Sequence, residues 1–464
     1  MHDVINSFTL IPDQEIIFKS ICTAFIDNSH KLLKIIGMGG TGKSQIINSF
    51  KMLFSQCPFL GTLAVVAPTG IAATNIGGST IHSYFKTNVH KFKATKPLDL
   101  PSIKLDTQIR LFSIKLILID EVYMVSYETF EEIHRRLCSI FSSNKIMGGV
   151  SIVCFGDPLQ MQPIPPGTPL FVNRNKISIW NSDEWEVAML TKTIRQNDPK
   201  FCQFLKNVRE SCCTDQAFSI ILQRELQNSL DSFTNPYSSV DQLIQSTQVV
   251  TGTKLMNRVV NEMFQCIYSV DPIICKIRSV CRSKLDCSQL EEHNLLLYLK
   301  KGDKVMITSN LCTNRGIVNG TRAIVEYIIY NSIDDLNSSK LPSAVILKIL
   351  NSNLYNNYYN DSLLLITPVR EQINSKILED IKDKLGVPLI LSFCLTIHKT
   401  QSLTIDRLLV LLDQSTFVRG LFYTAFSRVR DVSNLYCMVT KQLRKIKQLV
   451  GGMLPINQIR TKIL

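Results

Sequence analysis

The sequence predicts an α/β fold in which parallel β-sheets are flanked by helices. Four apolar segments near the start of the chain have the pattern of buried parallel strands, and they cover residues 32–36, 63–67, 116–119 and 151–155. Each is followed by a cluster of polar residues or glycines. Because ligands of open α/β sheets bind at the carboxyl ends of the strands, we expect these clusters to meet in one cleft.

The length of 464 residues corresponds to about three ordinary domains. We expect a first α/β domain at 1–190, with a small basic insertion at about 86–112, and a second, related α/β domain at 191–464. Short apolar strands of the second domain are expected at 249–251, 408–412 and 435–439. Residues 300–365 are rich in Val, Ile, Asn and Gly, with strands expected at 304–308, 321–329 and 344–350. This pattern predicts a small β-barrel-like insertion, and the Asn-rich stretch 351–360 is expected to be a surface loop.

Composition narrows the class of protein. The chain lacks both a run of about 18 apolar residues and a signal peptide, so we expect no membrane contact and a location in the nucleus or cytoplasm. The net charge of +13 suits a polyanionic partner, nucleic acid first. The 14 cysteines form no C-x-x-C pair, which favours reduced, buried thiols over a zinc site.

The most specific motif is a phosphate-binding loop. It reads Gly37-Met38-Gly39-Gly40-Thr41-Gly42-Lys43-Ser44 and fits the pattern G-x-x-x-x-G-K-[ST]. An apolar strand precedes it and a helical stretch, 45–53, follows it. In such loops the lysine pairs with the β- and γ-phosphates and the hydroxyl binds Mg²⁺, so Lys43 and Ser44 are candidates for these roles.

Two carboxylates follow the third apolar strand. Asp120 is suited to hold Mg²⁺, and Glu121 is suited to orient and deprotonate an attacking water. The fourth strand leads into Gly156-Asp157-Pro158-Leu159-Gln160, where the amide of Gln160 could bond a γ-phosphate. The sequence therefore predicts a nucleoside-triphosphate hydrolysis site.

Two arginines from later in the chain could complete this site. Arg195 and Arg428 could neutralise charge on the transferring phosphoryl group, although an isolated arginine is more often a surface or salt-bridge residue. The polar run Thr396-Ile397-His398-Lys399-Thr400-Gln401 is dense in hydrogen-bonding side chains. Such density in a turn fits contacts to a phosphate backbone, and residues 79–83 form a similar cluster.

The order of these motifs resembles that of the PIF-type and RecD-like DNA helicases, the 5′-to-3′ branch of helicase superfamily one. The resemblance extends from about residue 11 to residue 438 and rests on seven motifs. Pro12-Asp13-Gln14 matches the glutamine element that reads adenine in this family. The remaining matches are residues 67–83, the Asp120–Ser126 segment with the helix after it, 156–160, Arg195-Gln196, 395–401 and 423–428, and 318–321 matches the site of the family's β-barrel insertion.

This resemblance implies two RecA-like P-loop NTPase domains and an ATP-dependent, 5′-to-3′ DNA helicase that uses Mg²⁺. It implies that the partners are single-stranded DNA and duplex junctions, in DNA replication, repair or recombination, and we expect the protein to act as a monomer. It also implies that Arg195 and Arg428 move toward the γ-phosphate when the domains close on ATP. The residues expected to contact nucleic acid are Thr69, Thr80, His82, Thr396, His398, Lys399 and Gln401.

The chain departs from the family pattern in three ways. Ser402 follows Gln401 where Gly is usual, and Met161-Gln162 stands where Leu-Pro is usual. The chain also begins almost at the glutamine element, which is typical of a minimal helicase core, viral or transposon-encoded, or of one part of a larger assembly. Three alternatives stay open: an RNA-directed helicase, a translocase that does not unwind, and a catalytically slack nucleic-acid-binding subunit of a replication complex.

Overall fold

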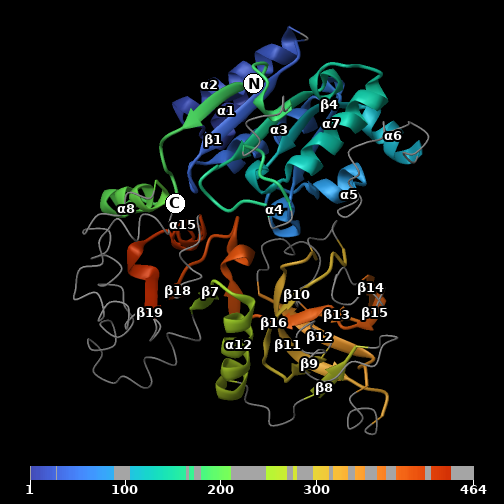
Figure 1. Ribbon diagram of the computed structural model, residues 1–464, viewed down its shortest axis with the longest axis vertical. Coiled ribbons are helices and arrows are strands. Elements are labelled where there is room, and N and C mark those ends of the chain that lie inside the picture. Colours follow the sequence, from blue (N-terminus) through green and yellow to red (C-terminus); the bar gives the residue numbers. More distant parts are fainter. Residues whose placement is uncertain are drawn as a thin grey trace. The chain divides into compact units, whose positions relative to one another are not determined.

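The computed structural model describes residues 2–27, 29–87, 105–163, 167–171, 179–210, 247–268, 275–279, 296–312, 317–332, 340–350, 363–372, 383–412 and 420–439 (Figure 1). By internal contacts the chain divides into two compact units. The first comprises residues 1–247 and 400–464, and the second comprises residues 248–399. The domain boundary expected at residue 190 stays a prediction.

The first unit is built on a six-stranded sheet with the strand order β3-β2-β4-β5-β1-β6. All its neighbouring strands pair in parallel. Its strands are β1 (Leu32–Gly37), β2 (Thr62–Ala67), β3 (Ser79–Thr80), β4 (Ile114–Ile119), β5 (Ser151–Gly156) and β6 (Glu186–Leu190). The structure confirms the four strands predicted from apolar segments, and it adds the short strand β3 and the edge strand β6.

Hydrophobic cores cover both faces of this sheet. Side chains alternate between the faces along a strand. In β4, Leu116 and Leu118 accordingly join one core, while Ile117 and Ile119 join the other. The Leu116 core includes residues of α1 (His2–Phe8), α2 (Pro12–Ile26), α3 (Lys43–Gln56) and α4 (Gly70–Asn75). The Ile117 core includes residues of α5 (Ile81–Phe85), α6 (Leu105–Phe112) and α7 (Tyr127–Phe141). Burial of both faces explains why the strands are continuous apolar runs.

The first unit also holds α8 (Pro199–Arg209), α15 (Leu421–Phe426) and the parallel pair β18 (Leu408–Leu412) and β19 (Leu435–Val439). Its short 3-10 helices are η1 (Pro58–Leu60), η3 (Val122–Met124), η4 (Ile146–Gly149), η5 (Ile179–Asn181) and η10 (Val432–Asn434). Helix α6 lies inside the segment predicted as an insertion at 86–112, whose residues 88–104 fall outside the described residues.

The second unit combines a parallel strand pair with an antiparallel sheet. β7 (Gln248–Thr251) pairs with β17 (Cys394–Thr396), and α12 (Lys254–Tyr268) contacts both strands. The antiparallel sheet has the order β13-β12-β11-β10-β16. It consists of β10 (Lys304–Ile307), β11 (Arg322–Ile329), β12 (Ala344–Ile349), β13 (Leu363–Ile366) and β16 (Leu389–Leu391). The strands predicted within 300–365 are thus confirmed, and β16 joins them from later in the chain.

The remaining elements of the second unit are two antiparallel pairs and a short helix. β8 (Cys275–Arg278) pairs with β9 (Leu296–Leu299), and β14 (Val369–Gln372) pairs with β15 (Asp383–Gly386). The 3-10 helix η8 (Ile397–Thr400) follows β17. The loop expected at 351–360 lies outside the described residues. In the described part of the chain, no helix has the length and apolar composition needed to cross a membrane.

Candidate active site

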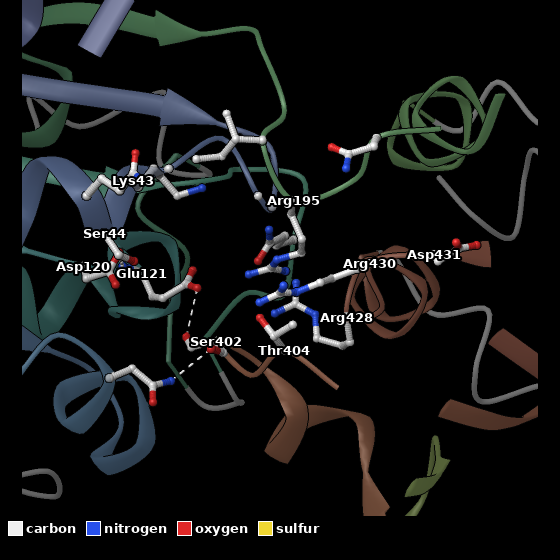
Figure 2. Close-up of a pocket in the computed structure, with 18 of the residues that line it drawn as sticks. Lys43, Ser44, Asp120, Glu121, Arg195, Ser402, Thr404, Arg428, Arg430 and Asp431 are labelled. Atoms are coloured by element: carbon white, nitrogen blue, oxygen red, sulfur yellow. Dashed lines mark hydrogen bonds between the residues drawn. The ribbon is translucent and has the colours of Figure 1, made fainter. Parts of the chain in front are cut away.

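The first unit contains a cavity of about 550 Å³ at the carboxyl end of its sheet (Figure 2). The predicted hydrolysis residues meet there, although they come from segments far apart in the sequence. The cavity is lined by Gly39, Gly40, Gly42, Lys43, Ser44, Gln45, Asn75, Asp120, Glu121, Gln160, Ile194, Arg195, Asn197, Asp198, Ser402, Thr404, Arg428, Arg430 and Asp431.

The phosphate-binding loop joins β1 to α3, as predicted. Its turn requires glycine, because the backbones of Gly40 (φ 91°) and Gly42 (φ 81°) lie in the left-handed region. The Lys43 ammonium donates to the carbonyl oxygens of Gly37 at 2.7 Å and Met38 at 3.0 Å. Both contacts are made to the loop itself, so this ammonium can exchange them for phosphate oxygens. The loop and the start of α3 therefore form an anion-binding site.

The two predicted carboxylates follow β4 directly. Asp120 is buried, and its Oδ1 accepts a hydrogen bond from the Glu121 N–H at 3.0 Å. Burial and the neighbouring Glu121 carboxylate raise the pKa of Asp120 to about 7, and Lys43 only partly offsets this. Glu121 itself has a left-handed backbone (φ 49°) that begins the short helix η3. A buried carboxylate beside a second one is the kind of donor pair that a cation stabilises.

The Glu121 carboxylate is held by two side chains from the segment after η8. Its Oε1 accepts from the Ser402 hydroxyl at 3.0 Å, and its Oε2 accepts from the Gln401 amide at 3.1 Å. Figure 2 shows Glu121 pointing toward Ser402. The contact joins residues 281 positions apart, so only the tertiary fold brings them together.

Two arginines lie in the site, Arg428 buried and Arg195 partly buried. Arg428 is 2% exposed, and it donates to the Thr424 carbonyl and to the Ser427 hydroxyl. Arg195 donates to the Ser427 carbonyl at 3.0 Å. Burial, with the adjacent Arg428 guanidinium, lowers the pKa of Arg195 to about 10, and burial likewise lowers that of Arg428. Among the described residues no carboxylate forms an ion pair with either arginine.

Burying a cation without an ion pair is costly, so a bound anion would stabilise this arrangement. In Figure 2 the guanidinium groups of Arg195, Arg428 and Arg430 point into the cavity. They face the same space as Lys43 and Glu121. A polyphosphate is the anion that fits a phosphate-binding loop opposed by arginines.

Hydrogen bonds from neighbouring residues connect the segments of these arginines to each other and to the loop. The N–H groups of Ile194 and Arg195 donate to the Gly40 carbonyl at 2.7 and 3.2 Å. The buried Gln196 amide donates to the Val429 carbonyl at 2.9 Å. The Gly39 N–H donates to the Tyr423 hydroxyl at 2.9 Å. The segments around Arg195-Gln196 and 423–428, both matched to the family pattern, therefore contact the loop directly.

Gln160 also reaches the cavity. It is buried, and its Oε1 has no hydrogen-bond partner among the described residues. Its backbone N–H donates to the carbonyl of Asp157, whose carboxylate is held in turn by the Arg209 guanidinium at 2.8 Å. An unpaired buried amide is unfavourable unless a ligand or water completes it. Gln160 is thus placed to contact a bound ligand.

Gln14, predicted to read adenine, is fully buried beside the phosphate-binding loop. Its amide donates to the Thr41 carbonyl at 3.0 Å and accepts from the Ile11 N–H at 3.1 Å. It is not among the residues that line the cavity. In this structure Gln14 supports the loop, and its contact to adenine stays a prediction.

The residues present fit Mg²⁺ and ATP. Ser44 and Asp120 line the same cavity, and they would hold Mg²⁺ together with phosphate and water oxygens. Because burial raises the pKa of Asp120, a bound cation would stabilise its charged form. A bound anion would in turn stabilise Arg195 and Arg428. Within the described ranges no group of three or more His, Cys, Asp and Glu side chains could hold a metal ion on its own.

Comparison with known families agrees with this geometry. The family model of PIF1-like helicases matches residues 9–217. A second model, the 2B domain of DNA helicase Pif1, matches residues 282–327. Over these residues the chain is similar to the PIF1-like helicases. The human ATP-dependent DNA helicase PIF1 (Homo sapiens) is 26% identical over 413 residues, which cover 86% of this chain and 57% of the human protein.

Solved structures confirm the predicted fold class. Bacteroides Pif1 bound to single-stranded DNA is 23% identical, with a TM-score of 0.69 over 95% of this chain and 96% of that one. A structure of two coordinating Pif1 helicases at forked double-stranded DNA is 22% identical, with a TM-score of 0.70 over 95% of this chain and 97% of that one. The protein therefore has the RecA-like α/β fold of PIF1-like helicases. It spans a little over half the length of the PIF1 relatives it matches.

The residues expected to contact nucleic acid in this PIF1-like chain are distributed over both units. In the first unit, Thr69 and Thr80 cap α4 and α5 through their hydroxyls, and His82 bonds Thr87 at 2.7 Å. In the second unit, Thr396 ends β17, and His398 and Lys399 lie in η8. Gln401 is buried, and its amide is engaged by Glu121. The nucleic-acid contacts of all seven residues stay predictions.

Several lining residues escaped the sequence reasoning. Asn75, Thr404, Arg430 and Asp431 line the cavity. Arg430 lies only two positions after Arg428, and this closeness to a motif could have marked it as a candidate site residue. The Asn75 amide donates to the Ser402 carbonyl at 2.9 Å. These residues are 327 positions apart, so a local sequence pattern does not predict their contact.

Proposed function

We propose that this PIF1-like chain is an ATP-dependent 5′-to-3′ DNA helicase that translocates on single-stranded DNA and unwinds duplexes. The observation that carries the proposal is a pair of arginines in one cavity with Lys43 and Glu121. Arg428 is buried and Arg195 is partly buried, and neither forms an ion pair with a described carboxylate. Binding alone would not need a base beside the phosphate loop. The arrangement supports phosphoryl transfer from ATP to water.

In this mechanism the loop amides and Lys43 bind the β- and γ-phosphates. Arg195 and Arg428 neutralise the charge that spreads over the γ-phosphoryl oxygens as the bond to the leaving group lengthens. Glu121 orients the attacking water and accepts its proton. Mg²⁺, held through Ser44 and Asp120, would neutralise phosphate charge in the same site. Most of the catalysis is thus positioning and charge neutralisation.

The proposal also covers domains and partners. Residues 191–464 are proposed to form the second RecA-like domain, with 300–365 as its β-barrel-like insertion. Single-stranded DNA is proposed to contact Thr69, Thr80, His82, Thr396, His398, Lys399 and Gln401. Two observations support these DNA contacts. The net charge is +13, and similar solved structures contain Pif1 helicases with single-stranded or forked DNA. Replication, repair or recombination are the processes that such an activity would serve.

A strand-displacement assay tests this function. Partial duplexes with a 5′ single-stranded overhang should be unwound in the presence of ATP, whereas duplexes of the same sequence with only a 3′ overhang should not. Lys43→Ala serves as the control for dependence on hydrolysis. Preference for the 3′ overhang would contradict the proposed polarity, and displacement of neither strand would leave only translocation or binding.

Binding of single strands should weaken as the pH rises through about 8. Burial and the nearby Lys254 ammonium lower the pKa of Lys399 to about 8, so this side chain is charged at neutral pH and loses its charge above that value. The affinity of the wild type should fall between about pH 7 and pH 9.5. Its log–log dependence on salt should become shallower by about 0.7, the slope expected for one phosphate contact to a single strand.

The matched control is Lys399→Arg, because a guanidinium stays charged over this pH range. In fluorescence-anisotropy titrations of a labelled oligonucleotide, its affinity should depend less on pH than that of the wild type. Equal pH dependence of the two proteins would remove Lys399 from the nucleic-acid contact.

A further inference from the structure

The proposed base, Glu121, is held at both carboxylate oxygens, and one of the two donors is a residue in which this chain departs from its family pattern. The Ser402 hydroxyl donates to Oε1 at 3.0 Å, and the Gln401 amide donates to Oε2 at 3.1 Å. Two bonds to opposite oxygens fix the plane of the carboxylate and stop it from turning about its last torsion. Each oxygen keeps a lone pair for a water.

Ser402 is itself fixed from its other side. Its carbonyl accepts a hydrogen bond from the Asn75 amide at 2.9 Å, and Asn75 is the last residue of α4. Ser402 lines the cavity together with Glu121 and Arg428. The backbone of Ser402 is thus bonded to α4 of the first unit, and its hydroxyl can hold Glu121 at a set position relative to the cavity.

The backbone of Ser402 adopts a conformation that is unfavourable for a residue with a side chain. Its φ of 64° lies in the left-handed region, where a residue with a Cβ is disfavoured and glycine is not. Non-glycine residues in such conformations cluster at functional sites, where another interaction offsets the strain. Here the interaction that serine adds is its bond to Glu121.

We propose that Ser402 is a positioning residue for ATP hydrolysis, and that its hydroxyl orients the Glu121 carboxylate toward the attacking water. The inference rests on the proposed function. Because Ser402 acts through Glu121, its loss should reduce the rate of the chemical step and leave the binding of ATP unchanged. A single hydrogen bond of ordinary net strength corresponds to a change in kcat of about three- to tenfold.

Three variants separate the hydroxyl from the backbone. Ser402→Ala removes the hydroxyl and keeps the Cβ. Ser402→Gly removes the hydroxyl and relieves the left-handed backbone. Ser402→Thr keeps a hydroxyl, but its branched Cβ suits the left-handed backbone less well. We expect kcat to fall about three- to tenfold in the alanine and glycine variants and to be restored in part by threonine. The KM for ATP should stay within about twofold, because the phosphate contacts are intact.

Thermal melting should give the opposite order. The Ser402→Gly variant should melt at a higher temperature than the Ser402→Thr variant, since glycine removes the backbone strain. A purely structural role for Ser402 predicts that activity follows stability, with glycine at least as active as serine and threonine the poorest. That result would overturn the proposal. Equal kcat values for serine, alanine and glycine would also overturn it.

A double variant closes the test within one assay. Adding Ser402→Ala to Glu121→Gln should not lower the residual single-turnover rate further, because the carboxylate that Ser402 positions is already absent. A further drop as large as the one that Ser402→Ala causes in the wild type would contradict the proposal. If the wild type hydrolyses ATP and Glu121→Gln does not, while the Ser402 variants match the wild type, this inference fails and the proposed function stands. If Glu121→Gln keeps full turnover, another group activates the water, and both the role of Glu121 and this inference fail. If the wild type does not hydrolyse ATP, the proposed function itself fails.

Discussion

Replacing Glu121 with Gln should lower ATP turnover by about 10²- to 10⁴-fold, the range that removal of a general base typically produces. The carboxylate lines the cavity with Lys43 and both arginines, so it is placed to act as the base toward a bound nucleotide. An amide fills the same space but does not take up a proton. Affinity for ATP should therefore be retained, and phosphate release combined with equilibrium binding of a nucleotide analogue measures the two effects separately.

Glu184→Gln is a matched control, because Glu184 is exposed and does not line the cavity. It should leave turnover unchanged. Lys43→Ala differs from Glu121→Gln in a useful way: it should reduce both turnover and nucleotide binding, since its ammonium exchanges loop carbonyls for phosphate oxygens. Near-normal turnover in Glu121→Gln would show that another group activates the water.

Replacing Arg428 with Ala should slow hydrolysis by about 10³- to 10⁵-fold, the effect of an arginine that stabilises the transferring phosphoryl group. The guanidinium is buried in the cavity with no ion pair among the described residues, so phosphate is the negative charge it is placed to meet. Affinity for single-stranded DNA should change by no more than a few-fold. Steady-state ATPase assays and anisotropy titrations on the same protein sample measure both quantities.

Folding must be separated from chemistry in this variant, since Arg428 also donates to the Thr424 carbonyl and the Ser427 hydroxyl. Arg428→Lys keeps the charge and loses the planar fork, and it should recover only part of the rate. Arg258→Ala, which removes an exposed partner of Glu262 on α12, is the control for loss of an arginine. A collapse of DNA binding with intact ATPase would make Arg428 a backbone contact.

The sequence predicted those elements whose signal is local. β1, β2, β4 and β5 are continuous apolar runs because both faces of their sheet are buried, and this pattern is visible without knowing the fold. β6 was missed because most of its side chains are exposed at the sheet edge, so it carries no such run. α6 was missed because it is short and lies within a stretch that shows no strong periodicity overall.

The candidate site divides in the same way. Lys43, Asp120 and Glu121 were predicted because each follows a strand within its own motif. The bonds that position them could not be predicted, since they depend on how distant segments pack. The bond from Gly39 to Tyr423 spans 384 positions, and the bond from Ser402 to Glu121 spans 281. Serine at position 402 was visible as a departure from the family pattern, but only the fold gives its hydroxyl a partner.

The most direct test of a nucleic-acid motor is ATP turnover measured without nucleic acid, with single-stranded DNA, and with RNA of the same length and sequence. We expect low basal turnover that single-stranded DNA raises severalfold and that RNA raises less. Stronger stimulation by RNA would point to an RNA-directed enzyme. Binding of single strands with no turnover in any condition would contradict the central claim and leave a nucleic-acid-binding subunit.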